Sequence, residues 1–331
     1  APAAHPQDFA DVLGHIQQTR QRVFVQANTA LMALYWQVGG IISHKVAQAE
    51  WGKGVVTELA QYIAQADPSI KGFSDKNLWR MKQFYETYGE DEQLATEWRV
   101  LSWSHNRLIM TLKSSAARAF YLKLSSNEKL SVRELERQID AAQFERSQIS
   151  PKLSSAAKVL HPAVNAAFKD SYVLEFLGLP EPHSENDLKR ALVHNMKAFV
   201  LELGKDFLHV GEEYRLQVGN RDFYIDLLFY HRGLSALVAF ELKVGQFEPE
   251  HMGQLNFYLE ALDRDVKKPH ENPSIGVLLC RDKDDEVVKY ALSRNLSPAL
   301  VAKYQLQLPD KKLIAAKLHE LLAQHEGMGD E

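Results

Sequence analysis

The spacing of hydrophobic positions along this chain changes near residue 205. Before that point apolar residues recur at helical spacing, and strand-like alternation is scarce. Some segments also carry helix start signals, such as Ser74 before one helix and the capping box formed by Ser131 and Glu134. The pattern predicts helices over residues 8–49, 53–66, 74–88, 104–112, 114–123 and 131–146.

Beyond residue 205, short runs of aromatic and β-branched residues alternate with helical segments. The runs predict strands over residues 207–218, 222–230, 235–243, 274–280 and 299–308. The helical segments among them cover residues 249–265 and 284–294, and a further predicted helix over 185–203 precedes the first strand. Strands interleaved with helices in this order are typical of an α/β layer with a mixed sheet.

The length of 331 residues exceeds that of one typical domain, so we expect two. All five tryptophans precede residue 104, which also separates the two halves in character. The sequence predicts an α+β two-domain protein. Its parts are an all-helical N-terminal domain over 1–150, a connector over 151–183 with several prolines, and an α/β domain over 184–325.

Three charged residues interrupt two apolar strands of the second domain, which form a predicted hairpin around Gly233, a residue available for positive φ. If the loop centres on Gly233 and Leu234, residue i pairs with residue 467 − i, and Asp226 faces Glu241. Lys243 shares the face of Glu241 because strand side chains alternate.

Opposed strand positions hold their Cβ atoms roughly 5 Å apart, where two like charges destabilise a sheet unless something compensates. Mg²⁺ would compensate, since it binds one or two carboxylates together with water and phosphate. Asp226, Glu241 and the carbonyl of Leu242 are the candidate ligands, and Lys243 could hold or polarise a water. The ordinary alternative is an ion pair on a half-exposed sheet, but the apolar flanking residues weigh against it.

A polar stripe follows on the predicted helix over 249–265. Glu250, Gln254 and Tyr258 are spaced by four residues, so they share one helical face. A helix packed across the hairpin would aim Gln254 at the carboxylate pair and Tyr258 at a substrate phosphate. For Tyr258, packing at the edge of the core is an equally good interpretation.

These residues resemble the PD-(D/E)XK nuclease superfamily. Asp226 stands for the motif Asp, Glu241-Leu-Lys243 for the ExK element, and Gln254-x-x-x-Tyr258 for a helix motif of its RecB-like branch. Longer stretches, including Glu241–Tyr258 and Glu271–Cys280, are similar to the YhcG-like family of bacterial proteins, in which a helical N-terminal domain precedes this nuclease-like domain. N-terminal matches include Tyr35–Gly39, Trp51–Val55, Lys71–Leu78 and Leu101–His105.

The resemblance implies a restriction-endonuclease-like fold and a metal-dependent endonuclease that hydrolyses phosphodiester bonds of nucleic acid, most often DNA. It implies Mg²⁺ as cofactor, with Mn²⁺ as a substitute. Many relatives add a helix-borne Glu to the metal site, and Glu185 and Glu202 both compete for that role. Glu202 interrupts an apolar run and is preferred, whereas Glu185 beside Ser184 also fits a helix cap.

The helices predicted over 53–66 and 74–88 resemble a helix-turn-helix or a winged-helix-like arrangement, although their connection is long. Basic residues cluster on and just before the second helix, and another follows Trp103. These candidates for nucleic-acid binding are Lys71, Lys76, Arg80, Lys82 and Arg107. A solvated basic face on a packing helix is the ordinary alternative.

Composition limits the size of a nucleic-acid surface and the cellular compartment that we expect. The net charge of −4 confines any nucleic-acid surface to a patch. The single cysteine, Cys280, lies in an apolar strand and excludes a disulfide framework. No apolar stretch is long enough for a membrane span and no signal peptide is evident, so we expect a cytoplasmic protein. A homo-oligomer is expected because duplex cleavage often needs two active sites. The alternative function is a catalytically silent nucleic-acid-binding or partner-recruiting module in a defence or mobile-element system.

Overall fold

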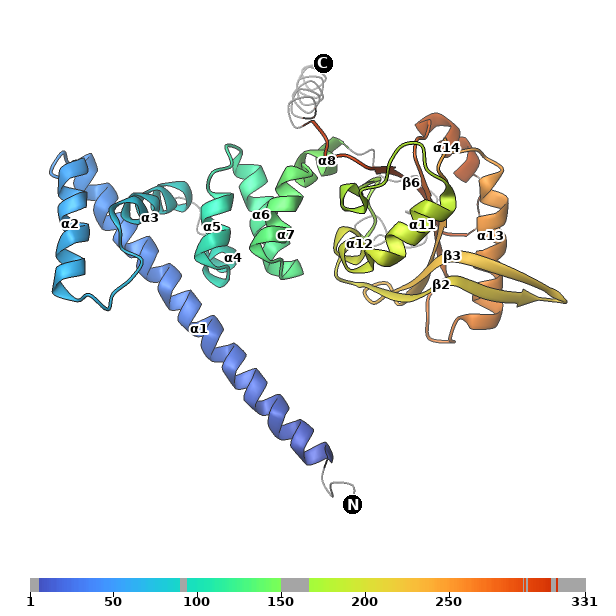
Figure 1. Ribbon diagram of the computed structural model, residues 1–331, viewed down its shortest axis with the longest axis horizontal. Helices are drawn as coiled ribbons and strands as arrows, with labels where there is room; N and C mark the ends of the chain where they lie inside the picture. The colour runs from blue at the N-terminus through green and yellow to red at the C-terminus, as the bar shows by residue number, and fades with distance from the viewer. Residues whose placement is uncertain are drawn as a thin grey trace, which may run out of the picture. The chain divides into compact units, whose positions relative to one another are not determined.

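The computed structural model describes residues 6–89, 94–149, 167–293, 295, 297–310 and 314. The chain divides into two compact units, Ala1–Ile139 and Asp140–Glu331, which are drawn in Figure 1 and described separately. The described residues of the first unit form helices, and those of the second form a six-stranded sheet with helices on both faces. The predicted combination of a helical N-terminal domain and a C-terminal mixed-sheet domain is confirmed.

The first unit begins with a long helix followed by shorter ones. They are α1 (Pro6–Ala47), α2 (Lys53–Ala66), α3 (Asp75–Tyr88), α4 (Ala95–Val100), α5 (Trp103–Ile109), α6 (Ser115–Glu128) and α7 (Val132–Asp140). Ser74 caps α3, where its hydroxyl accepts a hydrogen bond from the backbone N–H of Asn77. The sequence analysis missed α4, and the described part of this unit contains no strand that could form a wing.

Helices α1 and α3 cross very closely because α1 carries a glycine at the contact. A Cβ on Gly39 would lie only 2.0 Å from the carbonyl oxygen of Met81 in α3. Aromatic rings fill the space around this crossing, with Phe84 packed edge-to-face against Trp98 at 5.0 Å and Trp103 at 5.4 Å between centroids. The tryptophans of this unit therefore report on its folding.

The second unit contains α8 (Gln143–Ile149) and a mixed sheet. Its strands are β1 (Ser171–Val173), β2 (Phe207–Val218), β3 (Arg221–His231), β4 (Ala236–Leu242), β5 (Ile275–Cys280) and β6 (Ala299–Gln305), in the order β1-β6-β5-β4-β3-β2. The pairs β2–β3 and β3–β4 are antiparallel, whereas β4–β5, β5–β6 and β6–β1 are parallel. The two strands in the middle of the sheet, β4 and β5, are buried on both faces.

Helices cover both faces of this sheet (Figure 1). One core lies under α11 (Glu185–His194) and α12 (Met196–Leu203), where Leu192 and Phe199 pack against Phe240 and its neighbours. The other lies under α13 (His251–Ala261) and α14 (Asp285–Leu292), which contribute Leu255 and Leu292. Strand β4 runs between the two cores, so a charged residue at its end is surrounded by apolar side chains.

Some predicted elements differ in their limits. The helix predicted over 185–203 is two helices that break at Asn195, and the one over 249–265 ends in a π-helical turn at Leu262–Val266. The one over 131–146 is likewise split into α7 and α8. The predicted connector includes β1, an edge strand of the sheet, while residues 150–166 lie outside the described residues.

The domain limits 1–150, 151–183 and 184–325 remain a prediction. Cys280 is buried and reduced, as the sequence indicates. Within the described part of the chain, no helix has both the length and the apolar character needed to cross a bilayer.

Candidate active site

The β3–β4 hairpin has the predicted register. Leu227 pairs with Phe240 and His231 with Ala236, and both pairs sum to 467. The left-handed residue of the loop is Ser235, with φ of 48°, whereas the sequence analysis assigned positive φ to Gly233. Continuing the register by one residue places Asp226 opposite Glu241, where the ladder ends.

Asp226 replaces that ladder contact with its side chain. Its Oδ2 accepts a hydrogen bond from the backbone N–H of Leu242 at 3.0 Å. Its Oδ1 lies 3.5 Å from the ammonium of Lys189 on α11. Its carboxylate is therefore held at the end of β4, beside the backbone of the ExK segment.

Glu241 is buried, and only one of its two carboxylate oxygens has a partner among the described residues. Its residue is 4% exposed, and its Oε1 lies 3.2 Å from the ammonium of Lys243. Its Oε2 is buried and has no hydrogen-bond partner in the described part of the chain. Burial and then the charge of Asp226 raise the pKa of Glu241 to about 7, although Lys243 opposes the increase. A carboxylate buried in this way costs stability unless a cation joins it.

Lys243 bridges the hairpin and helix α11. Its ammonium lies 3.4 Å from Oε2 of Glu185, the first residue of α11. Burial alone would lower the pKa of Lys243, but Glu241 and Glu185 raise it above its ordinary value. A capping box between Ser184 and Asp187 fixes the start of α11, which leaves Glu185 free to face the hairpin.

Two residues that the sequence analysis missed complete this charged cluster. Lys189 lies 2.8 Å from Glu213 of β2 as well as near Asp226. Glu213 falls opposite Asp226 in the β2–β3 register and has φ of 44° at an irregular part of β2. The four-residue spacing of Glu185 and Lys189 was a usable signal, since it puts both on one helical face. No signal in the sequence indicated the left-handed conformation of Glu213.

Helix α13 brings Gln254 and Tyr258 to the same face of the sheet. Glu241 follows Leu237 and Ala239, which pack in the core beneath α13. Gln254 Nε2 donates a hydrogen bond to the Tyr258 hydroxyl at 2.7 Å. Burial raises the pKa of Tyr258, and the charges of Glu241 and Asp226 add to it. Two residues of the predicted polar stripe, Gln254 and Tyr258, therefore lie on the side of the sheet that carries the carboxylate pair.

The preference for Glu202 over Glu185 as the helix-borne acid has to be corrected. Its carboxylate is fully buried elsewhere, 3.3 Å from Lys169 Nζ and 3.8 Å from Arg146 Nη2, and it accepts the N–H of Val173. These contacts join α8, β1 and α12, so Glu202 serves packing. The other candidate, Glu185 of α11, lies 3.4 Å from Lys243 and so is the helix-borne acid that contacts this cluster.

The donor set fits Mg²⁺. Among the described residues, no three Asp, Glu, His or Cys side chains converge closely enough to hold a metal by themselves. Mg²⁺ usually needs only one or two carboxylates and completes its shell with water and phosphate. The unsatisfied Oε2 of Glu241, beside Asp226, is an oxygen that such an ion would pair with.

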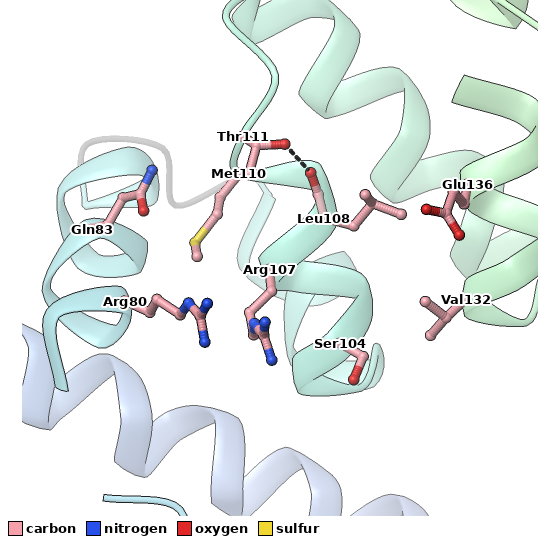
Figure 2. Close-up of a pocket in the computed structure, with 9 residues that line it drawn as sticks. All are labelled: Arg80, Gln83, Ser104, Arg107, Leu108, Met110, Thr111, Val132 and Glu136. Atoms are coloured by element: carbon pink, nitrogen blue, oxygen red, sulfur yellow. Dashed lines mark hydrogen bonds between the residues drawn. The ribbon is translucent and has the colours of Figure 1, made fainter. Parts of the chain in front are cut away.

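The first unit presents a separate basic hollow of ≈ 350 Å³ (Figure 2). Arg80 of α3 and Arg107 of α5 both point into it, and Ser104 and Glu136 lie at its other side. Within the described residues neither guanidinium pairs with an acid, so both can bind an anion. The structure thus brings together two of the basic residues singled out in the sequence.

The other predicted basic residues lie outside this hollow. Lys71 and Lys76 are exposed, while Lys82 pairs with Glu86 on the next turn of α3. The neighbouring Trp103 and His105 serve packing, because Trp103 Nε1 donates to Asn77 at 2.9 Å and His105 Nε2 bonds the carbonyl of Leu130 at 2.8 Å.

Comparison with known proteins places both parts of the chain. The family model described as the YhcG PDDEXK nuclease domain matches residues 165–319, and the DUF1016 N-terminal domain matches residues 11–146. A protein of Escherichia coli (strain K12) named "Putative nuclease YhcG" is 32% identical over 351 residues, which covers 94% of this chain and 93% of that protein.

Two solved structures align with parts of the chain. A repair endonuclease from Pyrococcus abyssi matches with a TM-score of 0.26 and 16% identity, over 39% of this chain and 50% of its own. EndoMS in its apo form matches with a TM-score of 0.26 and 19% identity, over 40% and 49% of the two chains.

Proposed function

Because this chain belongs to the YhcG family of PDDEXK nuclease-domain proteins, we propose that it is a metal-dependent endonuclease that cuts phosphodiester bonds of DNA. The observation that carries the proposal is the buried Glu241 carboxylate beside Asp226 and Lys243, one oxygen of which has no hydrogen-bond partner among the described residues. A structural ion pair would satisfy both oxygens. A site that awaits a cation would leave one open.

In this proposal Asp226, Glu241 and the backbone carbonyl of Leu242 hold Mg²⁺, with Mn²⁺ as a substitute. When bound, the ion would polarise the phosphate and lower the pKa of a water. The N–H of Leu242 holds the Asp226 carboxylate in position, and Glu185 tethers Lys243 from the helix side. The protein residues thus supply a preorganised anionic cradle.

Lys243 would orient the attacking water and take up negative charge that develops on the phosphate. Its contacts with Glu241 and Glu185 keep it protonated, which favours an electrostatic and positioning role over that of a free base. Gln254 would organise the site through its hydrogen bond to Tyr258, and the Tyr258 hydroxyl would contact the substrate phosphate.

The N-terminal unit would position the nucleic acid. Arg80 and Arg107 line one hollow, neither guanidinium pairs with an acid among the residues that the structure describes, and this geometry suits a backbone phosphate. Lys71, Lys76 and Lys82 would extend the electrostatic surface around it. With a net charge of −4, the protein depends on such a local patch.

The test is cleavage of linear duplex, branched and single-stranded DNA, and of RNA, in Mg²⁺, Mn²⁺ or EDTA. The intact chain is compared with Lys243→Gln and with a control, Lys197→Gln, which changes an exposed lysine of α12. We expect metal-dependent DNA products from the intact chain and the control, and a loss on the order of 100-fold or more in Lys243→Gln.

Folding is checked by circular dichroism and metal binding by calorimetry. Equal activity in Lys243→Gln would contradict the assigned role of that residue. Absence of both cleavage and metal binding would favour the silent nucleic-acid-binding or partner-recruiting module instead. Products from RNA alone would overturn the choice of DNA.

A further inference from the structure

Helix α1 exposes an unusual amount of apolar surface. Six large apolar side chains in its N-terminal half are each more than half exposed: Phe9, Val12, Leu13, Ile16, Val23 and Phe24. Figure 1 shows this half running beyond the other helices of the first unit. Exposed apolar side chains are ordinary when scattered, but a contiguous patch of them marks an interaction site.

The exposed residues form one stripe along almost the whole helix. At 3.6 residues per turn, Ile16, Leu34 and Ile41 project within about 20° of one direction, whereas the buried Tyr35 projects about 100° away. Leu34 and Ile41 are 42% and 57% exposed, while Tyr35 packs against Trp103. Helix α1 therefore has two apolar faces. One packs within the first unit, and the other is unpartnered in the described residues of that unit.

The unpartnered face has the spacing of a coiled-coil seam. Two series with seven-residue steps start at Phe9 and Leu13 and end at Gln37 and Ile41. Eight of their ten positions are apolar, and only Arg20 and Gln37 are not. A heptad repeat sustained over more than four heptads indicates pairing with another helix rather than with an irregular surface.

We propose that this face of α1 pairs antiparallel with α1 of a second copy of the chain. The seam is symmetric about residue 25, since its positions pair to a constant sum of 50, as in Phe9 with Ile41 and Ile16 with Leu34. Near the middle of the seam, a larger residue then lies opposite a small one, with Val23 opposite Ala27 and Arg20 opposite Ala30. A parallel, in-register pair would instead stack Arg20 on its own copy.

The exposed area is sufficient for a stable dimer. Nine large apolar side chains on or beside the seam are between 39% and 70% exposed. At roughly 90 Å² each, they offer on the order of 800 Å² per copy, which is the area per partner in a typical specific interface. A two-fold axis is also the commonest symmetry of homo-oligomers. The pairing does not depend on the proposed nuclease activity.

The test is the solution mass of the full chain by sedimentation or light scattering at about 20 μM. We expect twice the chain mass of 37.6 kDa for the intact protein. Ile16→Lys with Val23→Lys should reduce the mass to that of one chain, whereas the matched control Gln18→Lys with Gln21→Lys, off the seam of the same helix, should remain dimeric. Both variants should keep the native tryptophan fluorescence, because these side chains do not pack within the unit.

A monomeric intact protein would overturn the proposal, as would a seam variant that stays dimeric or a larger assembly. Orientation is tested by disulfide formation under a mild oxidant. A chain with Ile16→Cys should link to a chain with Leu34→Cys, whereas linkage of Ile16→Cys to itself would overturn the antiparallel arrangement. The native Cys280 is buried and does not compete.

Discussion

Glu241→Gln should stabilise the metal-free protein above pH 7 and at the same time abolish cleavage. Glu241 is buried, one of its oxygens has no hydrogen-bond partner within the part of the chain that the structure describes, and Asp226 faces it across the hairpin. The ionised carboxylate therefore costs folding free energy until a cation binds. A neutral amide of nearly the same shape removes that cost, but it also removes the negative charge that would bind the metal.

The magnitude follows from the pKa of Glu241. Its pKa in the folded protein is about 7, against an ordinary value of 4.5. Because the folded pKa is raised, the acid form contributes stability that is fully present below pH 4.5 and is lost as the pH rises through 7. The difference corresponds to about 3 kcal/mol at pH 8 and vanishes near pH 4.5. Glu241→Gln should recover most of it.

The assay is urea unfolding in EDTA at pH 8 and at pH 4.5. All five tryptophans precede residue 104, so their fluorescence follows the first unit, and circular dichroism must be used for the second. We expect a stabilised dichroism transition at pH 8 and an unchanged fluorescence transition. Added Mg²⁺ should stabilise the intact protein more than Glu241→Gln, since the variant lacks one ligand.

Glu202→Gln is the matched control, since Glu202 is equally buried but its carboxylate is satisfied. Removing its charge takes away a counterion of Arg146 and of Lys169, so this variant should lose about 3 kcal/mol at pH 8. A loss of stability in Glu241→Gln at pH 8, or a gain that persists undiminished at pH 4.5, would show that the ionised Glu241 carboxylate does not destabilise the fold.

Three further outcomes are expected. Replacing Arg80 and Arg107 by Gln together should weaken nucleic-acid binding and reduce the slope of log affinity against log salt by about 2, as measured by fluorescence anisotropy, without changing Mg²⁺ binding. Lys189→Gln should tighten Mg²⁺ binding several-fold in calorimetry, because the Lys189 ammonium no longer competes with the ion for the Asp226 carboxylate. Weaker Mg²⁺ binding by this variant would contradict the expectation. Gly39→Ala should destabilise the first unit by about 2 kcal/mol in fluorescence-detected unfolding, whereas Gly14→Ala, with open space around it, should stabilise α1 by up to about 1 kcal/mol.

The sequence was sufficient for the hairpin and its carboxylate pair because the information was local. A short loop fixes the sum of paired positions, and alternation then decides which side chains share a face. The predicted register is the observed one, even though the loop uses Ser235 rather than Gly233 for its left-handed residue. Register matters here because a slip of β4 by one residue would turn Glu241 away from Asp226 and into the core that contains Phe240.

The rest of the site depends on contacts between distant segments. Lys189 and Glu213 join the cluster only because α11 and β2 flank the hairpin. The spacing of Glu185 and Lys189 shows that they share a helical face, but it does not show that this face lies against the hairpin. Glu202 misled the prediction for a related reason. A Glu within an apolar run shows that the carboxylate is buried, but the sequence does not show that Arg146 and Lys169 are its partners.

The two buried glutamates therefore separate structure from function by their partners and not by their burial. Glu202 is enclosed by two cations and a backbone N–H, so its charge is compensated within the fold. Glu241 has one cation, a facing carboxylate and an open oxygen. Folding alone would favour a neutral residue at position 241. In the proposed function, the acid at that position would be explained by a bound cation that supplies the missing positive charge.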